Sequence, residues 1–116
     1  MKTIFIVDDS DTNLLMAEEA LEDHYRIITI PSAVKMFPFL EKIKPDLILL
    51  DIEMPIMNGF EALEKLNGLQ IGIPVVFLTG TINAEIEKRC SELGAAGIIA
   101  KPFSASSLVV QIKSYF

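Results

Sequence analysis

Five short apolar runs, each separated from the next by a stretch with helical periodicity, constrain the fold of this chain most. The runs are Thr3–Val7, Tyr25–Ile30, Leu47–Leu50, Val75–Leu78 and Gly97–Ala100. Apolar runs of this length indicate strands that are buried on both faces. The helical patterns lie near Asp11–Glu22, Ser32–Lys42, Asn58–Leu66, Ala84–Leu93 and Ser106–Tyr115. Strict alternation of strand and helix predicts an α/β fold with a doubly wound, five-stranded parallel sheet between two helical layers.

Length and composition narrow the class of protein. A chain of 116 residues fits one domain, 1–116, and a hydrophobic content of 51% is enough to fill its core. The net charge of −6 argues against direct nucleic-acid binding, which needs clustered Lys and Arg. No apolar segment approaches the length of a membrane span, and no signal peptide is visible, so we expect a cytoplasmic protein without a membrane anchor.

Single cysteine and histidine residues limit the chemistry further. Cys90 is the only cysteine, so no intrachain disulfide can form, and the Cys and His clusters of zinc sites are absent. We expect Cys90 on the buried face of a helix and His24 in a solvated turn.

One local conflict concerns Pro38, which falls inside the second helical pattern. Proline removes a backbone donor and its ring clashes with the preceding turn. The sequence therefore predicts that this helix starts late or kinks between Val34 and Pro38.

Polar residues gather where the expected strands end. Asp8 and Asp9 follow the first strand, Asp51 closes the third, Thr79 follows the fourth and Lys101 follows the fifth. Each fits an ordinary turn or helix cap when taken alone, but in a doubly wound sheet all five share one edge. Three crowded carboxylates repel one another, and a hard divalent cation such as Mg²⁺ relieves that repulsion. Lysine and a hydroxyl add donors for an anion, so the set predicts a phosphoryl site in which one carboxylate attacks.

These positions stand in motifs that resemble the receiver domain of two-component response regulators, the CheY-like family. The matching segments are Ile6-Val7-Asp8-Asp9-Ser10, Leu49-Leu50-Asp51-Ile52-Glu53-Met54-Pro55, Met57-Asn58-Gly59, Leu78-Thr79 and Lys101-Pro102-Phe103. The resemblance covers the whole chain and implies a flavodoxin-like sandwich with strand order 2-1-3-4-5.

The resemblance also implies a role for each acid. Asp51 corresponds to the phosphoacceptor, which takes a phosphoryl group from a sensor histidine kinase or a phosphotransfer protein. Asp9 would bind Mg²⁺ together with Asp51, Asp8 would help through water, and the backbone carbonyl of Glu53 would be a further ligand.

Thr79 and Lys101 would act on the phosphoryl group itself. By the same resemblance, Thr79 hydrogen-bonds its oxygens and shifts on activation, while Lys101 pairs with them and forms a cis peptide with Pro102. Family members often carry an aromatic residue three positions before the lysine, whereas this chain has Ile98 there.

The resemblance implies a switch rather than an enzyme, with only Mg²⁺-dependent self-phosphorylation and autodephosphorylation. Its signal would pass to an output domain after this chain or to a separate effector. The implied output face combines Ala84–Leu93, Gly97–Ala100 and Ser106–Tyr115, and pairing of two copies through it is a further expectation.

Three alternatives share parts of the pattern. An Asp-nucleophile phosphatase needs a second Asp two residues after the first, where this chain has Glu53. A flavin-binding electron carrier would meet repulsion between the cofactor phosphate and the acids that follow the first strand. A degenerate receiver that serves only as a docking module would not need the complete set of acids, hydroxyl and lysine.

Overall fold

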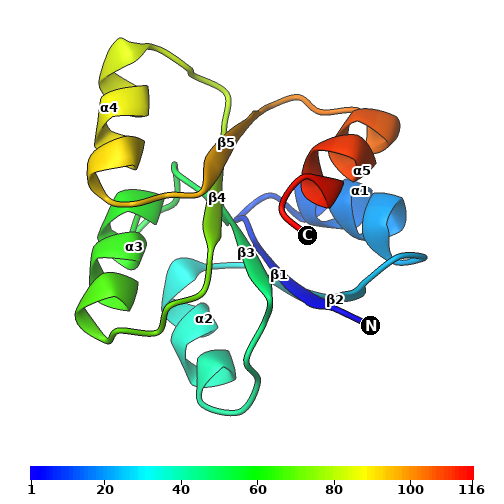
Figure 1. Cartoon of the computed structure of the whole chain (residues 1–116), viewed down its shortest axis with the longest axis horizontal. Coiled ribbons are helices and arrows are strands. Elements are labelled where there is room, and N and C mark those ends of the chain that lie inside the picture. Colours follow the sequence, from blue (N-terminus) through cyan, green and yellow to red (C-terminus); the bar gives the residue numbers. More distant parts are fainter.

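The computed structural model describes residues 1–116 and consists of five parallel strands and five helices (Figure 1). The strands are β1 (Thr3–Val7), β2 (Arg26–Ile30), β3 (Leu47–Asp51), β4 (Val75–Thr79) and β5 (Gly97–Ala100). The helices are α1 (Asp11–Leu21), α2 (Ala33–Leu40), α3 (Gly59–Gly68), α4 (Ala84–Glu92) and α5 (Ala105–Lys113). The sheet order is β2-β1-β3-β4-β5, and every pairing is parallel. The predicted α/β class, strand order and flavodoxin-like sandwich are confirmed.

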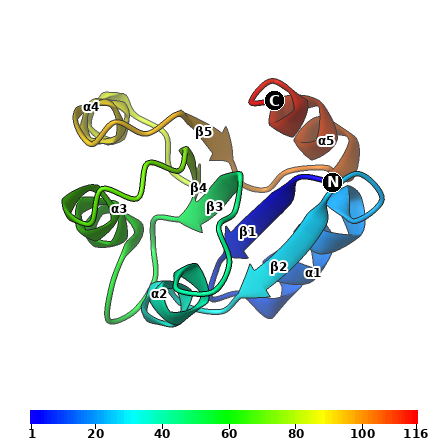
Figure 2. The same ribbon diagram turned by 60° about the horizontal axis from the view of Figure 1, so that its bottom comes forward.

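Helices cover both faces of the sheet, which explains the unbroken apolar strands. Figure 2 shows α1 and α5 on one side and α2, α3 and α4 on the other. Every residue of β1, β3 and β4 is buried, whereas the edge strands β2 and β5 are partly exposed. Alternate strand residues enter two separate hydrophobic clusters, with Phe5 and Phe77 in one and Ile4 and Leu78 in the other. Strands that bury both faces need no polar alternation.

Each helix begins at a residue whose side chain accepts a backbone N–H from the first turn, which satisfies an otherwise unpaired donor. These capping residues are Ser10, Ser32, Asn58, Asn83 and Ser104. Ser10 directly follows the two acids after β1, so α1 starts beside them. Because Ser104 is the cap of the last helix, α5 begins at Ala105, one residue before the expected Ser106.

The sequence predicted a late start or a kink for α2; the late start is wrong, and the kink between Val34 and Pro38 stays a prediction. The hydroxyl of Ser32 accepts the N–H of Lys35 at 3.2 Å, and this cap fixes the start of the helix at Ala33. Pro38 lies near the other end, because α2 already stops at Leu40. The proline therefore removes a single donor from the last turns of a short helix.

Smaller differences from the expected bounds have local causes. Tyr25 stays outside β2, because its N–H donates back to the carbonyl of Leu21 at 3.0 Å. The pairing of β3 and β4 continues through Asp51 and Leu78, so Asp51 is itself a strand residue.

Cys90 is buried and His24 is exposed in a turn, as expected. None of the helices combines the length and the apolar character needed to cross a bilayer.

Candidate functional site

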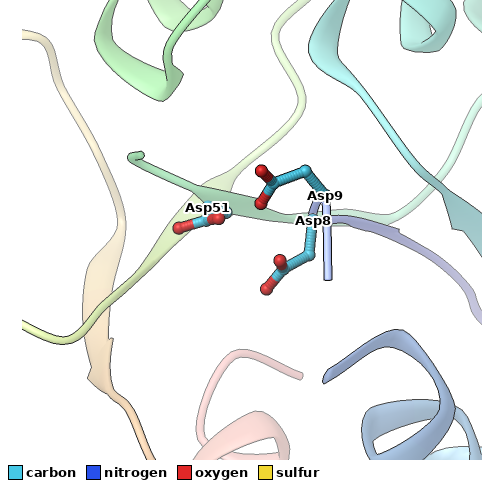
Figure 3. Close-up of side chains that lie close together, drawn as sticks. All are labelled: Asp8, Asp9 and Asp51. Carbon is cyan, nitrogen blue, oxygen red and sulfur yellow. The ribbon is translucent and has the colours of Figure 1, made fainter. Parts of the chain in front are cut away.

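The carboxyl ends of the central strands bring three carboxylates together. Asp8 and Asp9 follow β1, and Asp51 is the last residue of the adjacent strand β3. Figure 3 shows the three side chains at this edge of the sheet. One carboxylate oxygen from each lies within 4.8 Å of the others. Asp8 and Asp51 are buried, whereas Asp9 is exposed, so the cluster is open to solvent on one side.

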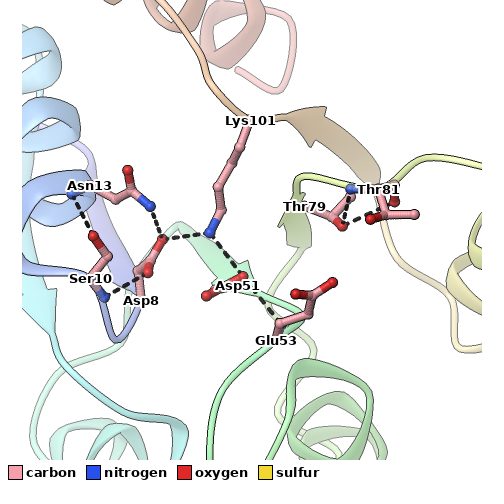
Figure 4. Close-up of polar contacts among 8 residues, drawn as sticks. All are labelled: Asp8, Ser10, Asn13, Asp51, Glu53, Thr79, Thr81 and Lys101. Atoms are coloured by element: carbon pink, nitrogen blue, oxygen red, sulfur yellow. Dashed lines mark hydrogen bonds and ion pairs between the residues drawn. The ribbon is translucent and has the colours of Figure 1, made fainter.

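Lys101 bridges the two buried acids. Its Nζ lies 3.0 Å from Oδ2 of Asp8 and 3.0 Å from Oδ1 of Asp51 (Figure 4). Two buried carboxylates without a cation between them would be costly, because each loses its hydration. The shared lysine offsets part of that cost, and its side chain is still 18% exposed.

The protonation behaviour of the pair follows from burial. Burial raises the pKa of Asp51 to about 6; the hydrogen bond from Lys101 opposes the rise, and the charge of Asp8 adds to it. Burial by itself would lower the pKa of Lys101, but hydrogen bonds to Asp51 and Asp8 outweigh it and hold that pKa above its ordinary value. At neutral pH, Asp51 is therefore mostly ionised and Lys101 is a cation.

Asp8 is held by more than the lysine. Its Oδ1 accepts the backbone N–H of Ser10 at 2.9 Å, and its Oδ2 accepts the side-chain amide of Asn13 at 3.3 Å. The sequence did not identify Asn13, because an asparagine in the first turn of a helix carries no signal of its own. Only its position five residues after an acid at a strand end could have drawn attention to it.

The loop after β3 approaches Asp51 closely. The N–H of Gly59 donates to the carbonyl of Ile52 at 2.8 Å. A Cβ at Gly59 would lie 2.5 Å from the backbone oxygen of Asp51 and 2.9 Å from Cα of Ile52. Only glycine fits this approach, so the segment Met57-Asn58-Gly59 matched in the sequence also shapes the site.

The same loop turns sharply at Ile56, which has a φ of 71°. The N–H of Met57 donates to the carbonyl of Pro55 at 2.8 Å, which closes a γ-turn around Ile56. Positive φ is uncommon for a β-branched residue. The side chain of Ile56 is 93% exposed, so the turn presents an apolar group beside the site.

Thr79 is buried at the end of β4, but its hydroxyl is engaged elsewhere. It donates to the carbonyl of Thr81 at 3.0 Å and accepts the N–H of Thr81 at 3.1 Å. The structure thus places Thr79 at the predicted edge without a hydrogen bond to Asp51 (Figure 4). Ile98 is partly buried and packs against the hydrophobic cluster on the side of α3 and α4.

The backbone N–H of Glu53 donates to Oδ1 of Asp51 at 3.2 Å, while its own side chain is exposed. The peptide bond between Lys101 and Pro102 is cis, as expected. It carries the chain from β5 toward α5 directly after the lysine.

The donor set fits a hard divalent cation. Three carboxylate oxygens from two strand ends converge, and no cysteine or histidine is among them. All-oxygen sites of this kind suit Mg²⁺, which keeps several waters and binds through one or two carboxylates. The exposed side of the cluster leaves room for those waters.

Comparison with known proteins gives a family for the whole chain. Residues 4–113 match the model of the response regulator receiver domain. The chemotaxis protein CheY of Halobacterium salinarum is 30% identical over 109 residues, which cover 93% of this chain and 91% of that protein. The crystallised chemotaxis protein CheY4 of Vibrio cholerae superposes with a TM-score of 0.94 at 26% identity, covering 100% of this chain and 99% of that one.

Other relatives are much longer. A probable cyclic di-GMP phosphodiesterase of Vibrio cholerae is 38% identical over 115 residues, or 97% of this chain. The match covers only 26% of the phosphodiesterase, so this chain spans about a quarter of that relative's length. The similarity therefore concerns one domain of that relative.

Proposed function

The chain belongs to the response regulator receiver domain family, and from that premise we propose that Asp51 is the residue that accepts the phosphoryl group. The observation that carries the assignment is a buried carboxylate whose Oδ1 lies 3.0 Å from Nζ of Lys101. A second buried acid, Asp8, shares the same lysine at 3.0 Å. The family accounts for the acids, hydroxyl and lysine together, so the docking-only and phosphatase alternatives are not needed.

The proposed reaction moves one phosphoryl group. An oxygen of the Asp51 carboxylate forms a bond to phosphorus, the bond from phosphorus to the donor's imidazole nitrogen breaks, and the imidazole takes up a proton. Lys101 and the N–H of Glu53 hold the acceptor carboxylate in place, and Lys101 supplies positive charge to the phosphoryl oxygens. Positioning and charge neutralisation are the main contributions that a protein makes to such a transfer.

Mg²⁺ is the metal that this site would hold. Asp9, Asp51 and the carbonyl of Glu53 would be its direct protein ligands, and Asp8 would reach it through water. When bound, it neutralises charge on the acids and on the phosphoryl oxygens. Without it, Lys101 is the cation that contacts the two buried acids.

The response to phosphorylation would begin at Thr79. We infer that its hydroxyl leaves Thr81 and turns to the phosphoryl group, which breaks the two hydrogen bonds of the Thr79–Thr81 turn. Ile98 would follow by repacking rather than by rotation of an aromatic ring. The face of α4, β5 and α5 would then report the state to an output domain, to a separate effector or to a second copy of the chain. Val110 on α5 is 69% exposed.

The donor partner is a phosphohistidine on a sensor kinase or a phosphotransfer protein. A groove of about 260 Å³ lies between α1 and the start of α5. It is lined by Met16, Glu19, Ala20, Phe103 and Ala105. Its mainly apolar lining suits a helix of such a partner. A cytoplasmic location for this exchange stays a prediction.

The activity expected of the chain itself is limited to its own phosphorylation and dephosphorylation. Any catalytic activity of a longer protein would belong to another domain. The side chain of Glu53 is exposed next to Asp51, and Gly80 leaves open space on the side of β4.

Intact mass spectrometry tests the proposal. The protein is incubated with acetyl phosphate and Mg²⁺, and we expect a gain of one phosphoryl group that is stable in acid and labile in base. Asp51→Ala should abolish the gain, whereas Asp23→Ala, at an exposed aspartate in the turn after α1, should keep it. A wild-type chain that stays unmodified with Mg²⁺ present would contradict the proposal.

A further inference from the structure

We propose that Asn13 is a positioning residue for Asp8, because its amide keeps that buried carboxylate hydrogen-bonded when Lys101 turns to the phosphoryl group. The inference rests on the proposed function and adds a residue to it. The contacts that matter are those of the Asp8 carboxylate in the absence of any phosphoryl group.

Asp8 is fully buried and accepts three donors (Figure 4). The N–H of Ser10 occupies Oδ1 at 2.9 Å. Oδ2 is shared by Nζ of Lys101 at 3.0 Å and the amide of Asn13 at 3.3 Å. Lys101 makes the shorter of the two contacts and is the only charged donor, so it contributes most to stabilising Oδ2 of Asp8 when no phosphoryl group is present.

That arrangement changes when a phosphoryl group is attached to Asp51. The distances from Lys101 to Asp8 and to Asp51 are equal at 3.0 Å, so one nitrogen serves two acids. A lysine that follows the phosphoryl oxygens moves away from Oδ2 of Asp8. A buried carboxylate that loses its partner is strongly destabilised unless another donor remains. Asn13 is the remaining side-chain donor to that oxygen.

Helix α1 does not need the side chain of Asn13 for its cap. The cap of α1 uses the hydroxyl of Ser10, which accepts the backbone N–H of Asn13 at 3.3 Å. The side-chain amide of Asn13 is thereby held close to Asp8 while making no bond to the helix backbone. Its neighbour Thr12 is exposed, and its side chain makes no hydrogen bond.

A state-dependent effect follows from this geometry. Without a phosphoryl group, Lys101 satisfies Oδ2 of Asp8 and loss of the Asn13 amide costs little. With the group bound, the amide has to replace the lysine and its loss is felt. A contact that merely stabilises the fold would instead affect both states equally.

The experiment measures both states with beryllofluoride, a tetrahedral analogue of the phosphoryl group. Wild type, Asn13→Ala, Asn13→Leu and the matched control Thr12→Ala are compared. Melting temperatures are recorded without metal, and beryllofluoride affinities are measured by calorimetry at fixed Mg²⁺. Leucine has the same branching and the same number of side-chain heavy atoms as asparagine but no donor, so it separates loss of the amide from loss of packing.

Without metal, we expect both Asn13 variants to have melting temperatures close to that of wild type. We expect both to bind beryllofluoride roughly tenfold or more weakly than wild type, which is the usual effect of removing a residue that hydrogen-bonds a metal-site carboxylate. Thr12→Ala should match wild type in both measurements. Unchanged affinity in either Asn13 variant would overturn the inference. If wild type neither binds beryllofluoride nor gains a phosphoryl group at Asp51, the proposed function itself fails. That outcome can be told apart from failure of the inference about Asn13, in which wild type still binds.

Discussion

The carboxylate of Asp51 is the group on which the proposed chemistry depends. Asp51 is 3% exposed, yet its pKa rises only to about 6 because the hydrogen bond from Lys101 opposes the effect of burial. The side chain is therefore charged at neutral pH, as a nucleophile must be. The native state binds the proton of Asp51 more tightly than the unfolded chain does, so this group destabilises the metal-free fold at neutral pH.

Asp51→Asn should accordingly stabilise the metal-free protein at pH 7. The rise in pKa from 3.8 to about 6 corresponds to about 3 kcal/mol. That gain should be complete above pH 6, shrink as the pH falls from 6 toward 4, and vanish below the unfolded-state pKa. Urea denaturation in a chelator at several pH values measures it. Glu19→Gln removes the charge of an exposed acid and is the control; equal stability of wild type and Asp51→Asn at pH 7 would contradict the prediction.

The sequence predicted some of these side chains and missed others for a physical reason. A charged residue directly after a buried strand is visible as a break in an apolar run, which located Asp8, Asp51 and Lys101 at one edge. Asn13 and Thr81 act through contacts that depend on how a helix or turn folds back on the strand end. No local pattern encodes such contacts, so only the structure shows them.

Among the elements, the start of α3 is the one most tightly fitted to the site. Asn58 and Glu61 form a reciprocal capping box, with bonds of 2.9 and 3.0 Å between side chains and backbone. Gly59 then enters the space beside the carbonyl of Asp51. The helix is therefore fixed by its cap and docked against the backbone of the acceptor residue. Sequence periodicity placed this helix well, since its stripe of buried residues is regular, but it could not reveal how closely the backbones approach.

Substitution of two glycines in α3 by alanine should change the stability of the protein in opposite directions. Gly59→Ala should destabilise the protein by about 1 to 3 kcal/mol, because the new methyl group meets backbone that cannot move aside. Gly68→Ala should stabilise it by roughly 0.4 to 1 kcal/mol, since open space surrounds that position. Chemical denaturation of both variants measures the difference. A Gly59→Ala variant as stable as wild type would show that the loop yields more easily than this packing implies.

On the scale of the whole molecule, the parallel sheet gathers charge at one edge. The chain carries a net charge of −6, and two of its acids are buried side by side at that edge. Alternation of strands and helices was sufficient to predict this topology, because right-handed crossovers leave few other arrangements. The bounds of α2 were less predictable, because a side-chain cap outweighed the effect of an internal proline.

Mg²⁺ should stabilise the whole domain through this edge. At a concentration a hundred times the dissociation constant, the expected gain in unfolding free energy is about 2.7 kcal/mol. Thermal denaturation with Mg²⁺ and then with excess chelator measures the gain and its reversal, with NaCl of equal ionic strength as the control. Asp9→Asn should reduce the gain, and a gain of the same size from NaCl alone would indicate general screening instead of a site.

Because Lys101 is shared by two acids that precede it in the chain, the site is completed late during protein synthesis. Asp8 and Asp51 leave the ribosome long before Lys101, which is added near the end of the 116 residues. At about 5 to 20 residues per second, a growing chain carries its acceptor for several seconds before it carries the cation that completes the site. A nascent chain therefore lacks the cation that the proposed transfer uses until β5 and Lys101 have been made.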